Sequence, residues 1–181
     1  MSVIVDIVSD VICPWCFLGK RHLDRAIASL EEGAVEVRWR PFLLDASIPK
    51  EGMDRKAYLT AKFGAERLEG LHAPLIAAGR AAGVPYHFER ITRTPNTLNA
   101  HRLIAWSHAA GKQHEMAERL FMDYWSEGKD VGDTRVLIDA AVAVGLDATL
   151  VAQLLGSEAD LDRVIAEINR AAEFGITGVP T

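Results

Sequence analysis

The segment VIVDIVSDVICPWC, residues 3–16, decides how the rest of the chain is interpreted. Residues 3–8 form a β-branched run that only Asp6 interrupts, which is typical of an interior strand in a parallel sheet. Cys13 and Cys16 follow, and they are the only cysteines among 181 residues. Two thiols with two residues between them, where a strand passes into a helix, predict a disulfide that forms and breaks during a reaction.

The CPWC motif predicts different roles for its two thiols. Because Pro14 suits the first helical position, where a missing N–H costs nothing, Cys13 is expected to be the N-cap residue. The unpaired N–H groups and the helix dipole should then lower the pKa of Cys13 below about 8.5. We predict that Cys13 attacks the substrate and that the more enclosed Cys16 resolves the mixed disulfide. Pro14 and Trp15 are expected to tune the redox potential and to contact the substrate.

Two other uses of a CxxC motif are disfavoured. A structural zinc site needs four ligands, but there is no third cysteine, His22 would be a third ligand at best, and the other histidines lack paired spacing. A static disulfide is also unexpected, because a chain of this length can bury a sufficient core and so short a loop would restrict the unfolded chain very little. The sequence therefore predicts a redox motif and no metal.

The composition predicts one or two compact soluble domains, since 49% of the residues are hydrophobic. A net charge of −5 argues against binding to nucleic acid, which requires clustered Lys and Arg. Residues 1–10 lack the basic region and cleavage site of a signal peptide, and no window approaches the roughly 18 apolar residues of a spanning helix. We therefore expect a cytoplasmic protein that does not contact a membrane.

Hydrophobic periodicity extends the pattern beyond the motif. From Pro14 the apolar positions fit a helix through Leu30, with Gly33 placed for a left-handed C-terminal cap. Residues 35–40 alternate between apolar and polar, so the segments together predict a βαβ unit. Trp15 is expected to be exposed, and the other tryptophans are expected in the core: Trp39, Trp106 and Trp125.

Residues 45–155 predict a helical insertion, in which residues 84–88 are the longest strand candidate. Asn96, Asp133 and Asp147 are placed as N-cap residues, and Pro74 should kink or split a long helix. The predicted helices span residues 55–63, 65–82, 97–110, 113–127, 134–144 and 148–155.

A further helix is predicted to begin at Ser157, with Asp160 in the capping-box position. Its apolar stripe is suited to packing on a sheet and consists of Leu161, Val164, Ile165, Ile168 and Ala172.

Four stretches spread over almost the whole chain carry a family resemblance: SDVICPWCFLGK (9–20), RPF (40–42), PNTLNAHRL (95–103) and TGVPT (177–181). They resemble the FrnE-type group of DsbA-family thiol-disulfide oxidoreductases, in the thioredoxin superfamily. The resemblance implies an α/β, thioredoxin-like fold with a large all-helical insertion. Residues 1–44 and 156–181 would form the discontinuous thioredoxin-like domain, and residues 45–155 the insertion.

The resemblance also implies a second half of the site, opposite the motif. Pro180 would be the cis-proline of the family and would turn Val179 toward Cys13, so that the Val179 N–H and C=O bind an extended substrate. The family pattern continues after GVPT with two strands and a helix, so we expect that the chain is truncated and that these elements are missing.

The implied activity is thiol-disulfide exchange with protein or small-molecule thiols. The Cys13–Cys16 disulfide would be the redox centre, with no bound cofactor and with glutathione as a candidate co-substrate. The alternative is a glutathione-dependent isomerase or transferase of the 2-hydroxychromene-2-carboxylate isomerase or kappa-class type, which shares the scaffold. Because that chemistry needs no second cysteine, Cys16 favours the redox interpretation.

Asn96, Thr97, His101 and Arg102 allow two interpretations. They could point into the active-site cleft and bind a substrate carboxylate, or they could be a helix cap and an interdomain hydrogen-bonding group. Because capping residues are routine in such a position, the structural interpretation is favoured.

Overall fold

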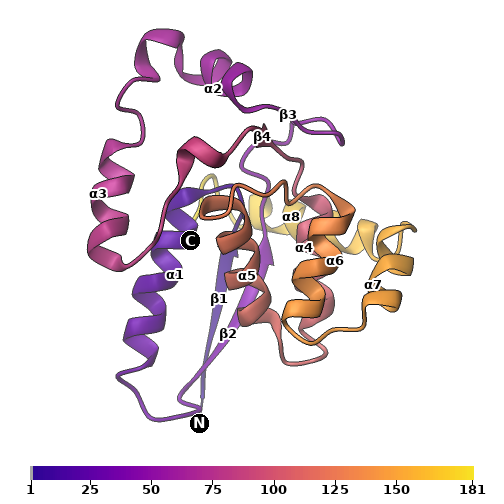
Figure 1. Ribbon diagram of the computed structural model, residues 1–181. Coiled ribbons are helices and arrows are strands. Elements are labelled where there is room, and N and C mark those ends of the chain that lie inside the picture. Colours follow the sequence, from indigo (N-terminus) through magenta and orange to yellow (C-terminus); the bar gives the residue numbers. More distant parts are fainter. Residues whose placement is uncertain (1) are drawn as a thin grey trace.

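β1 (Val3–Ser9) and β2 (Val35–Pro41) form a parallel pair in the middle of the molecule (Figure 1). The register sets Val3 opposite Val35 and Ser9 opposite Pro41. α1 (Pro14–Ile27) connects the two strands, so the predicted βαβ unit is confirmed. The computed structural model describes residues 2–181.

The remaining elements are helical apart from one short antiparallel pair, β3 with β4. In chain order they are β3 (Met53–Asp54), α2 (Arg55–Phe63), the 3-10 helix η1 (Ala65–Arg67), α3 (Ala73–Ala82), the 3-10 helix η2 (Phe88–Arg90), β4 (Arg93–Thr94), α4 (Leu98–Ser107), α5 (Gln113–Trp125), α6 (Thr134–Ala143), α7 (Ala148–Leu155) and α8 (Leu161–Glu173).

The helices surround the strand pair unevenly. α1 runs along one side of β1 and β2, while α4, α6 and α7 lie on the other side (Figure 1). α4, α5 and α8 contact β2, and α1 contacts both α3 and α5. α2 and the β3–β4 pair lie beyond the end of the strands at which α1 begins (Figure 1). The CPWC motif is therefore placed where the strand pair meets the α2–α3 segment.

The core is centred on α5, whose inward side chains are almost completely buried: Met116, Ala117, Leu120, Phe121, Tyr124 and Trp125. The ring of Phe17 in α1 stacks on that of Phe121, with 5.3 Å between centroids and 6° between planes. Burying a large apolar side chain contributes about 1.5–3 kcal/mol. This packing ties the helix that carries the motif to the helical part of the molecule.

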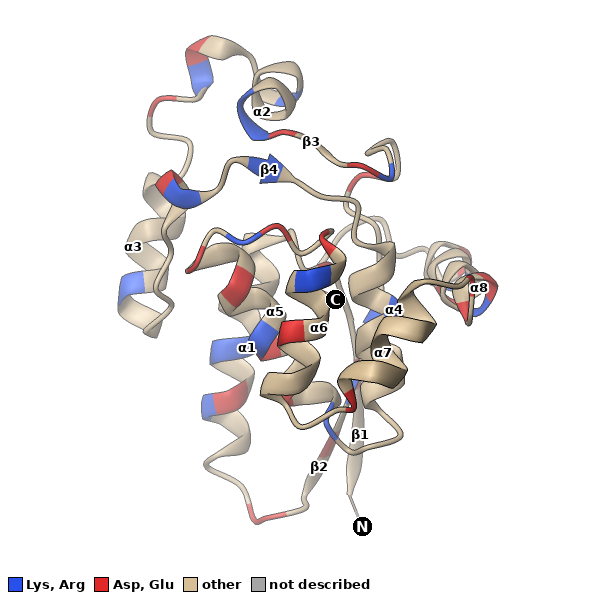
Figure 2. Cartoon of the chain, turned by 45° about the vertical axis from the view of Figure 1, so that its right-hand side comes forward, with Lys and Arg blue, Asp and Glu red and all other residues tan. Residues whose placement is uncertain are grey.

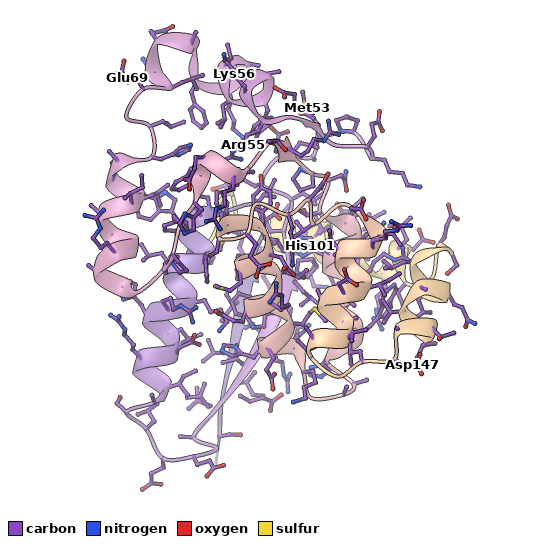
Figure 3. The ribbon with its side chains drawn as sticks, viewed as in Figure 1. Met53, Arg55, Lys56, Glu69, His101 and Asp147 are labelled. Carbon is purple, nitrogen blue, oxygen red and sulfur yellow. The ribbon has the colours of Figure 1, made fainter. Side chains whose placement is uncertain are left out.

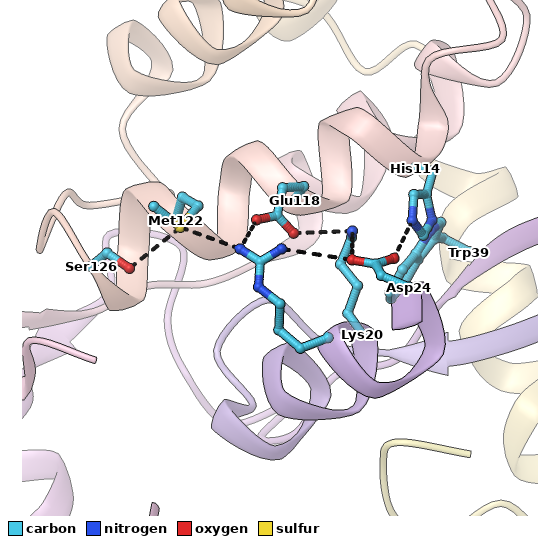
Figure 4. A network of polar contacts seen from close by, with 8 residues as sticks. Lys20, Asp24, Trp39, His114, Glu118, Met122 and Ser126 are labelled. Carbon is cyan, nitrogen blue, oxygen red and sulfur yellow. Dashed lines mark hydrogen bonds and ion pairs between the residues drawn. The ribbon is translucent and has the colours of Figure 1, made fainter. Parts of the chain in front are cut away.

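A buried ion-pair network also joins α1 to α5 (Figure 4). Lys20 is 4% exposed, and its Nζ lies 2.9 Å from Asp24 Oδ2 and 3.0 Å from Glu118 Oε2. Arg21 adds a contact to Glu118 through Nη2. A buried cation costs free energy unless it is paired, and here Lys20 is paired twice.

His114 extends this network to β2. Its Nδ1 lies 3.2 Å from Trp39 Nε1, which can only donate, so Nδ1 is the acceptor and Nε2 carries the proton. Nε2 donates to Asp24 Oδ1 at 2.7 Å. Although burial acts to raise it, the hydrogen bonds from His114 and Lys20 lower the pKa of Asp24 to about 2. Basic and acidic residues lie side by side on α1 and α5 (Figure 2).

Several sequence-based boundaries are confirmed. α2 and α7 have the predicted bounds, and the Asp133 and Asp147 side chains accept hydrogen bonds from the first turns of α6 and α7. The predicted helix over residues 65–82 is split, because Pro74 lies in the first turn of α3 and the chain before it forms only η1 and turns. A proline is tolerated in a first turn and not in a helix interior.

The predicted end of the first helix was wrong. α1 ends at Ile27, and the Ser29 hydroxyl donates to the Ala26 carbonyl at 2.7 Å, competing with the helical hydrogen bonds. Leu30 is exposed outside the helix. Gly33 does have a positive φ of 77°, but it serves the turn before β2.

The strand candidate over residues 84–88 does not form a strand. Val84 N–H donates to the Gly79 carbonyl at the end of α3, and Tyr86 N–H donates to the Val84 carbonyl, so this backbone is used in turns. The interior-strand prediction for residues 3–8 holds only in part, because Val3 and Ile4 are exposed while Val8 is buried. Few elements cover the beginning of β1.

The helix predicted from Ser157 begins later, at Leu161. Ser157 Oγ instead donates to the Leu154 carbonyl at the end of α7, and the N-cap is Asp160, with a left-handed φ of 57°. In the predicted apolar stripe, Val164 is buried whereas Ile165 is exposed. Trp39 and Trp125 lie in the core as expected, but Trp106 is only partly buried.

Candidate active site

Cys13 is the N-cap residue of α1, in extended backbone conformation, and Pro14 begins the helix as predicted. Cys16 N–H donates to the Cys13 carbonyl at 3.1 Å. Both cysteines are free thiols and both are buried, with exposed fractions of 2% for Cys13 and 1% for Cys16. The exposed fractions hardly differ, so they do not show which thiol is more enclosed. The two residues differ in that Cys13 lines the groove described below and Cys16 does not.

The two thiols have opposite pKa shifts. A hydrogen bond from the Cys16 thiol is the main cause that lowers the pKa of Cys13, and the N–H groups of Cys16 and Trp15 add to it. Burial and the charge of Asp10 act in the other direction. Burial, and then the neighbouring Cys13 thiolate, raise the pKa of Cys16. These shifts favour the thiolate form at Cys13 and the protonated form at Cys16.

The chain end lies beside the motif (Figure 1). The Val179–Pro180 peptide bond is cis. The Cys13 thiol donates to the Val179 carbonyl, with 3.6 Å between sulfur and oxygen. Thr181 is held by two backbone hydrogen bonds to Val8, at 2.8 and 3.2 Å. The residues implied by the family resemblance are thus next to the motif, although they are 166 positions away in sequence.

A groove of about 360 Å³ opens beside Cys13, between the motif and the α2–α3 segment. Cys13, Pro14, Trp15 and Val179 line it, whereas Cys16 and Pro180 do not. Trp15 is 48% exposed, which agrees with the prediction that it lies at the surface. Most of the remaining lining is apolar, including Ile12, Leu44, Tyr58, Leu59, Phe63, Leu71, Leu75 and Trp125. A predominantly apolar concave surface with few polar groups is typical of a ligand site.

Residues 4–181 match the protein family described as a DSBA-like thioredoxin domain. The chain belongs to this family. The predicted relationship to DsbA-family proteins and the predicted thioredoxin-like α/β fold are confirmed.

Solved structures resemble this DsbA-like chain over nearly its whole length. A protein of Streptomyces coelicolor named a "probable DsbA oxidoreductase", SCO1869, is 32% identical, with a TM-score of 0.88 over 98% of this chain and 78% of that one. A 2-hydroxychromene-2-carboxylate isomerase is 18% identical, with a TM-score of 0.76 over 99% and 84%. The cytosolic disulfide reductase DsbM of Pseudomonas aeruginosa, solved with glutathione, is 20% identical, with a TM-score of 0.69 over 99% and 84%. The last two likenesses show the fold alone.

Sequence reasoning missed two residues of the DsbA-like site. The Tyr86 hydroxyl donates to the Pro14 carbonyl at 2.5 Å, and burial followed by the charges of the two thiols raises the pKa of Tyr86. Arg55, the first residue of α2, is buried and lines the groove. No local pattern marks either residue, because both reach the site through contacts between distant segments.

The candidates of the 96–102 segment do not line the groove. Asn96 Oδ1 accepts from Leu98 N–H at 3.0 Å, although Thr97 is the N-cap residue of α4. His101 Nε2 donates to the Phe42 carbonyl at 2.8 Å, and Arg102 donates to backbone carbonyls near Ser157. Their contacts agree with the structural interpretation.

Two searches of the described residues concern other kinds of site. Within residues 2–181, no three His, Cys, Asp or Glu side chains are grouped so that they could hold a metal ion. None of the helices in that range combines the length and the apolar character needed to cross a membrane.

Proposed function

We propose that this chain is a thiol-disulfide oxidoreductase that exchanges disulfides with protein or small-molecule thiols through Cys13 and Cys16. The observation that carries the proposal is the difference between the two sulfurs. Cys13 borders the groove and has a lowered pKa, whereas Cys16 lies behind it and has a raised pKa. A nucleophile that meets the substrate and a second thiol that meets only the first are what disulfide exchange requires.

The reaction with a substrate disulfide proceeds in two exchanges. The Cys13 thiolate attacks one substrate sulfur, so that a mixed disulfide forms and the first substrate thiolate leaves. Cys16, deprotonated as the Cys13 thiolate is consumed, then attacks the Cys13 sulfur and releases the second thiol. Two electrons pass from the protein to the substrate. The proton that Cys16 loses goes to one of the two product thiolates, and the other product thiolate takes up a proton from the solvent. The opposite direction runs through the same intermediate.

Val179, Pro180, Pro14 and Trp15 complete the proposed substrate site. A Cys13 thiolate no longer donates to the Val179 carbonyl, so that oxygen becomes available to an N–H group of an extended substrate. Trp15 offers an exposed apolar ring at the groove edge. Pro180 packs on the helix that carries the motif, since a Cβ at Gly19 would lie 3.5 Å from Pro180 Cγ.

The proposal is tested with single substitutions and a small disulfide. The reduced Cys16→Ser protein should accumulate a mixed disulfide, seen as the added mass of one half of the small disulfide on Cys13, and should turn over slowly. Cys13→Ser should lose exchange by at least about a thousandfold, because the remaining thiol is buried and has a raised pKa. Full activity of Cys13→Ser would refute the assignment.

The alternative is a glutathione-dependent isomerase or transferase, which the likeness to 2-hydroxychromene-2-carboxylate isomerase supports at the level of fold. That chemistry would use Cys13 and leave Cys16 without a role. The hydrogen bond between the two thiols favours the redox function. The two are separated by Cys16→Ala, which should stop multiple-turnover disulfide exchange but only slow isomerase turnover, because the thiol that lowers the pKa of Cys13 is lost.

We further propose a cytoplasmic setting with glutathione or a similar small thiol as co-substrate. The DsbM structure, named cytosolic and solved with glutathione, supports both parts by likeness of fold. A groove of about 360 Å³ lies within the size range of small-molecule sites. Measuring the reduction potential of the Cys13–Cys16 couple against glutathione would test whether glutathione serves as co-substrate, and would give the direction of electron flow.

A further inference from the structure

Arg55 is a buried cation that has few partners of its own. It is 8% exposed, and its Nη1 donates to the Tyr124 hydroxyl at 3.0 Å. Its Cζ lies 5.4 Å from the Trp125 ring centroid and 5.9 Å from that of Tyr124. Within residues 2–181, no carboxylate lies within ion-pair distance of Arg55, and its guanidinium has no second hydrogen-bond acceptor, although its backbone N–H donates to the Thr92 carbonyl at 3.0 Å. A guanidinium has five N–H donors, so most of them have no acceptor in the protein.

The other two buried Lys and Arg side chains of the described chain each have two or more protein partners. Lys20 meets the carboxylates of Asp24 and Glu118. Arg102, which is 2% exposed, makes four hydrogen bonds of 2.7–2.8 Å to oxygens of Asn99, Leu154, Ser157 and Ala159. Burying a charge without partners is costly, so the protein normally supplies them. Arg55 has only one side-chain hydrogen bond and no carboxylate partner, and its side chain lines the groove beside Cys13.

The groove itself is positive. Its lining contains Arg55, Lys62 and His72 but no Asp or Glu. Lys62 is already bound to Tyr58 and Asp45, at 2.8 and 3.4 Å, and burial followed by the charge of Arg55 lowers the pKa of His72. Arg55 is therefore the groove cation whose charge lacks a protein counter-ion.

We propose that Arg55 binds a carboxylate of the thiol or disulfide that reacts at Cys13, so that the groove selects small, carboxylate-bearing thiols. This inference rests on the proposed exchange function. The planar guanidinium forms two parallel hydrogen bonds with a carboxylate, which fixes orientation as well as position. Most of the groove lining is apolar, and an ion pair is stronger in surroundings of lower dielectric constant than in bulk water. Arg55 is then a specificity-determining residue, and it takes no part in bond breaking.

The assisted step is the first exchange. An anionic disulfide binds with its carboxylate at Arg55, the Cys13 thiolate attacks the nearer sulfur, and the other half leaves as a thiolate that takes up a proton. Cys16 closes the protein disulfide and releases the second carboxylate-bearing thiol. The two electrons come from the protein dithiol, as in the proposed function.

The test compares two small disulfides of similar size. The disulfide of 3-mercaptopropionate is anionic, and that of 2-mercaptoethanol is neutral. The rate constant for oxidation of the reduced protein is measured with each, and the anionic-to-neutral ratio is taken for every variant. Arg55→Met, which keeps the length of the side chain, should lower the ratio by about tenfold or more, because a charge-assisted pair is lost. Arg55→Lys, which keeps the charge but not the fork, should give an intermediate ratio.

Lys56→Met is the matched control. Lys56 is the next residue on α2 but is exposed and does not line the groove, and Figure 3 labels it on the outer side of the helix, with Arg55 toward the rest of the molecule. The anionic-to-neutral ratio of Lys56→Met should stay within about twofold of the parent ratio, because an exposed charge is screened by solvent.

The outcomes separate the two levels of the proposal. An unchanged ratio in Arg55→Met would overturn the role of Arg55 while leaving disulfide exchange intact. Failure of the unsubstituted protein to react with either disulfide would overturn the proposed function itself. If Arg55→Met does not fold, a salt titration of the parent and of Arg55→Lys decides. The rate with the anionic disulfide should fall as chloride rises and the neutral rate should not, and equal salt dependence would contradict the proposal.

Discussion

The two ends of α1 are built in opposite ways. At the C-terminal half, Lys20 and Asp24 are matched by Glu118 and His114, so that each charge has a partner across the α1–α5 contact (Figure 4). At the N-terminal turn, Cys13 has backbone N–H groups, one thiol and a groove in front of it. The paired end holds the helix in place, and the unpaired end keeps a sulfur available for chemistry.

The largest expected effect comes from breaking the paired end. Lys20→Met leaves Glu118 Oε2 buried without the cation that lies 3.0 Å away. We expect the free energy of unfolding to fall by about 2–4 kcal/mol. This is less than the usual cost of breaking a fully buried ion pair, because Asp24 and Glu118 are partly exposed. Urea denaturation measures it.

Lys112→Met is the control for Lys20. Lys112 and Glu115 form an exposed pair of similar length, 3.1 Å, whose loss should cost no more than about 0.5 kcal/mol. The pKa of Cys13 should be the same in both variants, because Lys20 is not among the groups that shift it. Equal destabilisation by the two substitutions would remove the contrast between the ends of α1.

A second substitution disturbs the reactive end from outside. A Cβ at Gly79 in α3 would lie 2.5 Å from the ring of Tyr86, whose hydroxyl holds the Pro14 carbonyl. Alanine would normally favour a helix interior by about 0.5–1 kcal/mol over glycine. The clash should outweigh this and make Gly79→Ala destabilising by about 1–2 kcal/mol.

A double substitution distinguishes this clash from a general effect on α3. Tyr86→Leu removes the ring that Gly79→Ala would meet, so the two changes together should cost less than the sum of the single ones. Thermal unfolding of the four proteins gives the coupling. Strict additivity would mean that Tyr86 is not the neighbour that forbids a side chain at position 79.

Local chemistry explains which parts of the molecule could be predicted. Pro14 at the first helical position, Asp147 as a cap and Pro74 as a break all act within a few residues of the chain. The contacts that were missed join distant segments: Arg55 to Tyr124, 69 residues apart, and Tyr86 to Pro14, 72 apart. No periodicity records such pairs. The division into residues 1–44 with 156–181 and residues 45–155 stays a prediction.

The pH dependence of the paired end gives a smaller effect. The pKa of Asp24 is about 2, below the ordinary 3.8, so its ionised form stabilises the folded chain above about pH 4, and this contribution is lost as the pH falls toward 2. Asp24→Asn should therefore be less stable than the parent by about 1 kcal/mol at neutral pH. The difference should shrink between pH 4 and 2 when followed by urea denaturation. A difference that stays constant over this range would show that the charge of Asp24 is not the cause.

The finest change acts on the reactive end alone. Cys16→Ala removes the thiol that donates to Cys13, the largest of the causes that lower its pKa, while leaving the N–H groups of Trp15 and of residue 16 in place. The pKa of Cys13 should rise, so the thiolate absorbance should appear at higher pH and alkylation by iodoacetamide at neutral pH should slow. Cys16→Ser keeps a hydroxyl donor and should raise the pKa less. If Cys16→Ala left the pKa of Cys13 unchanged, the backbone N–H groups would be sufficient to stabilise the thiolate. The second cysteine would then serve only to resolve the mixed disulfide.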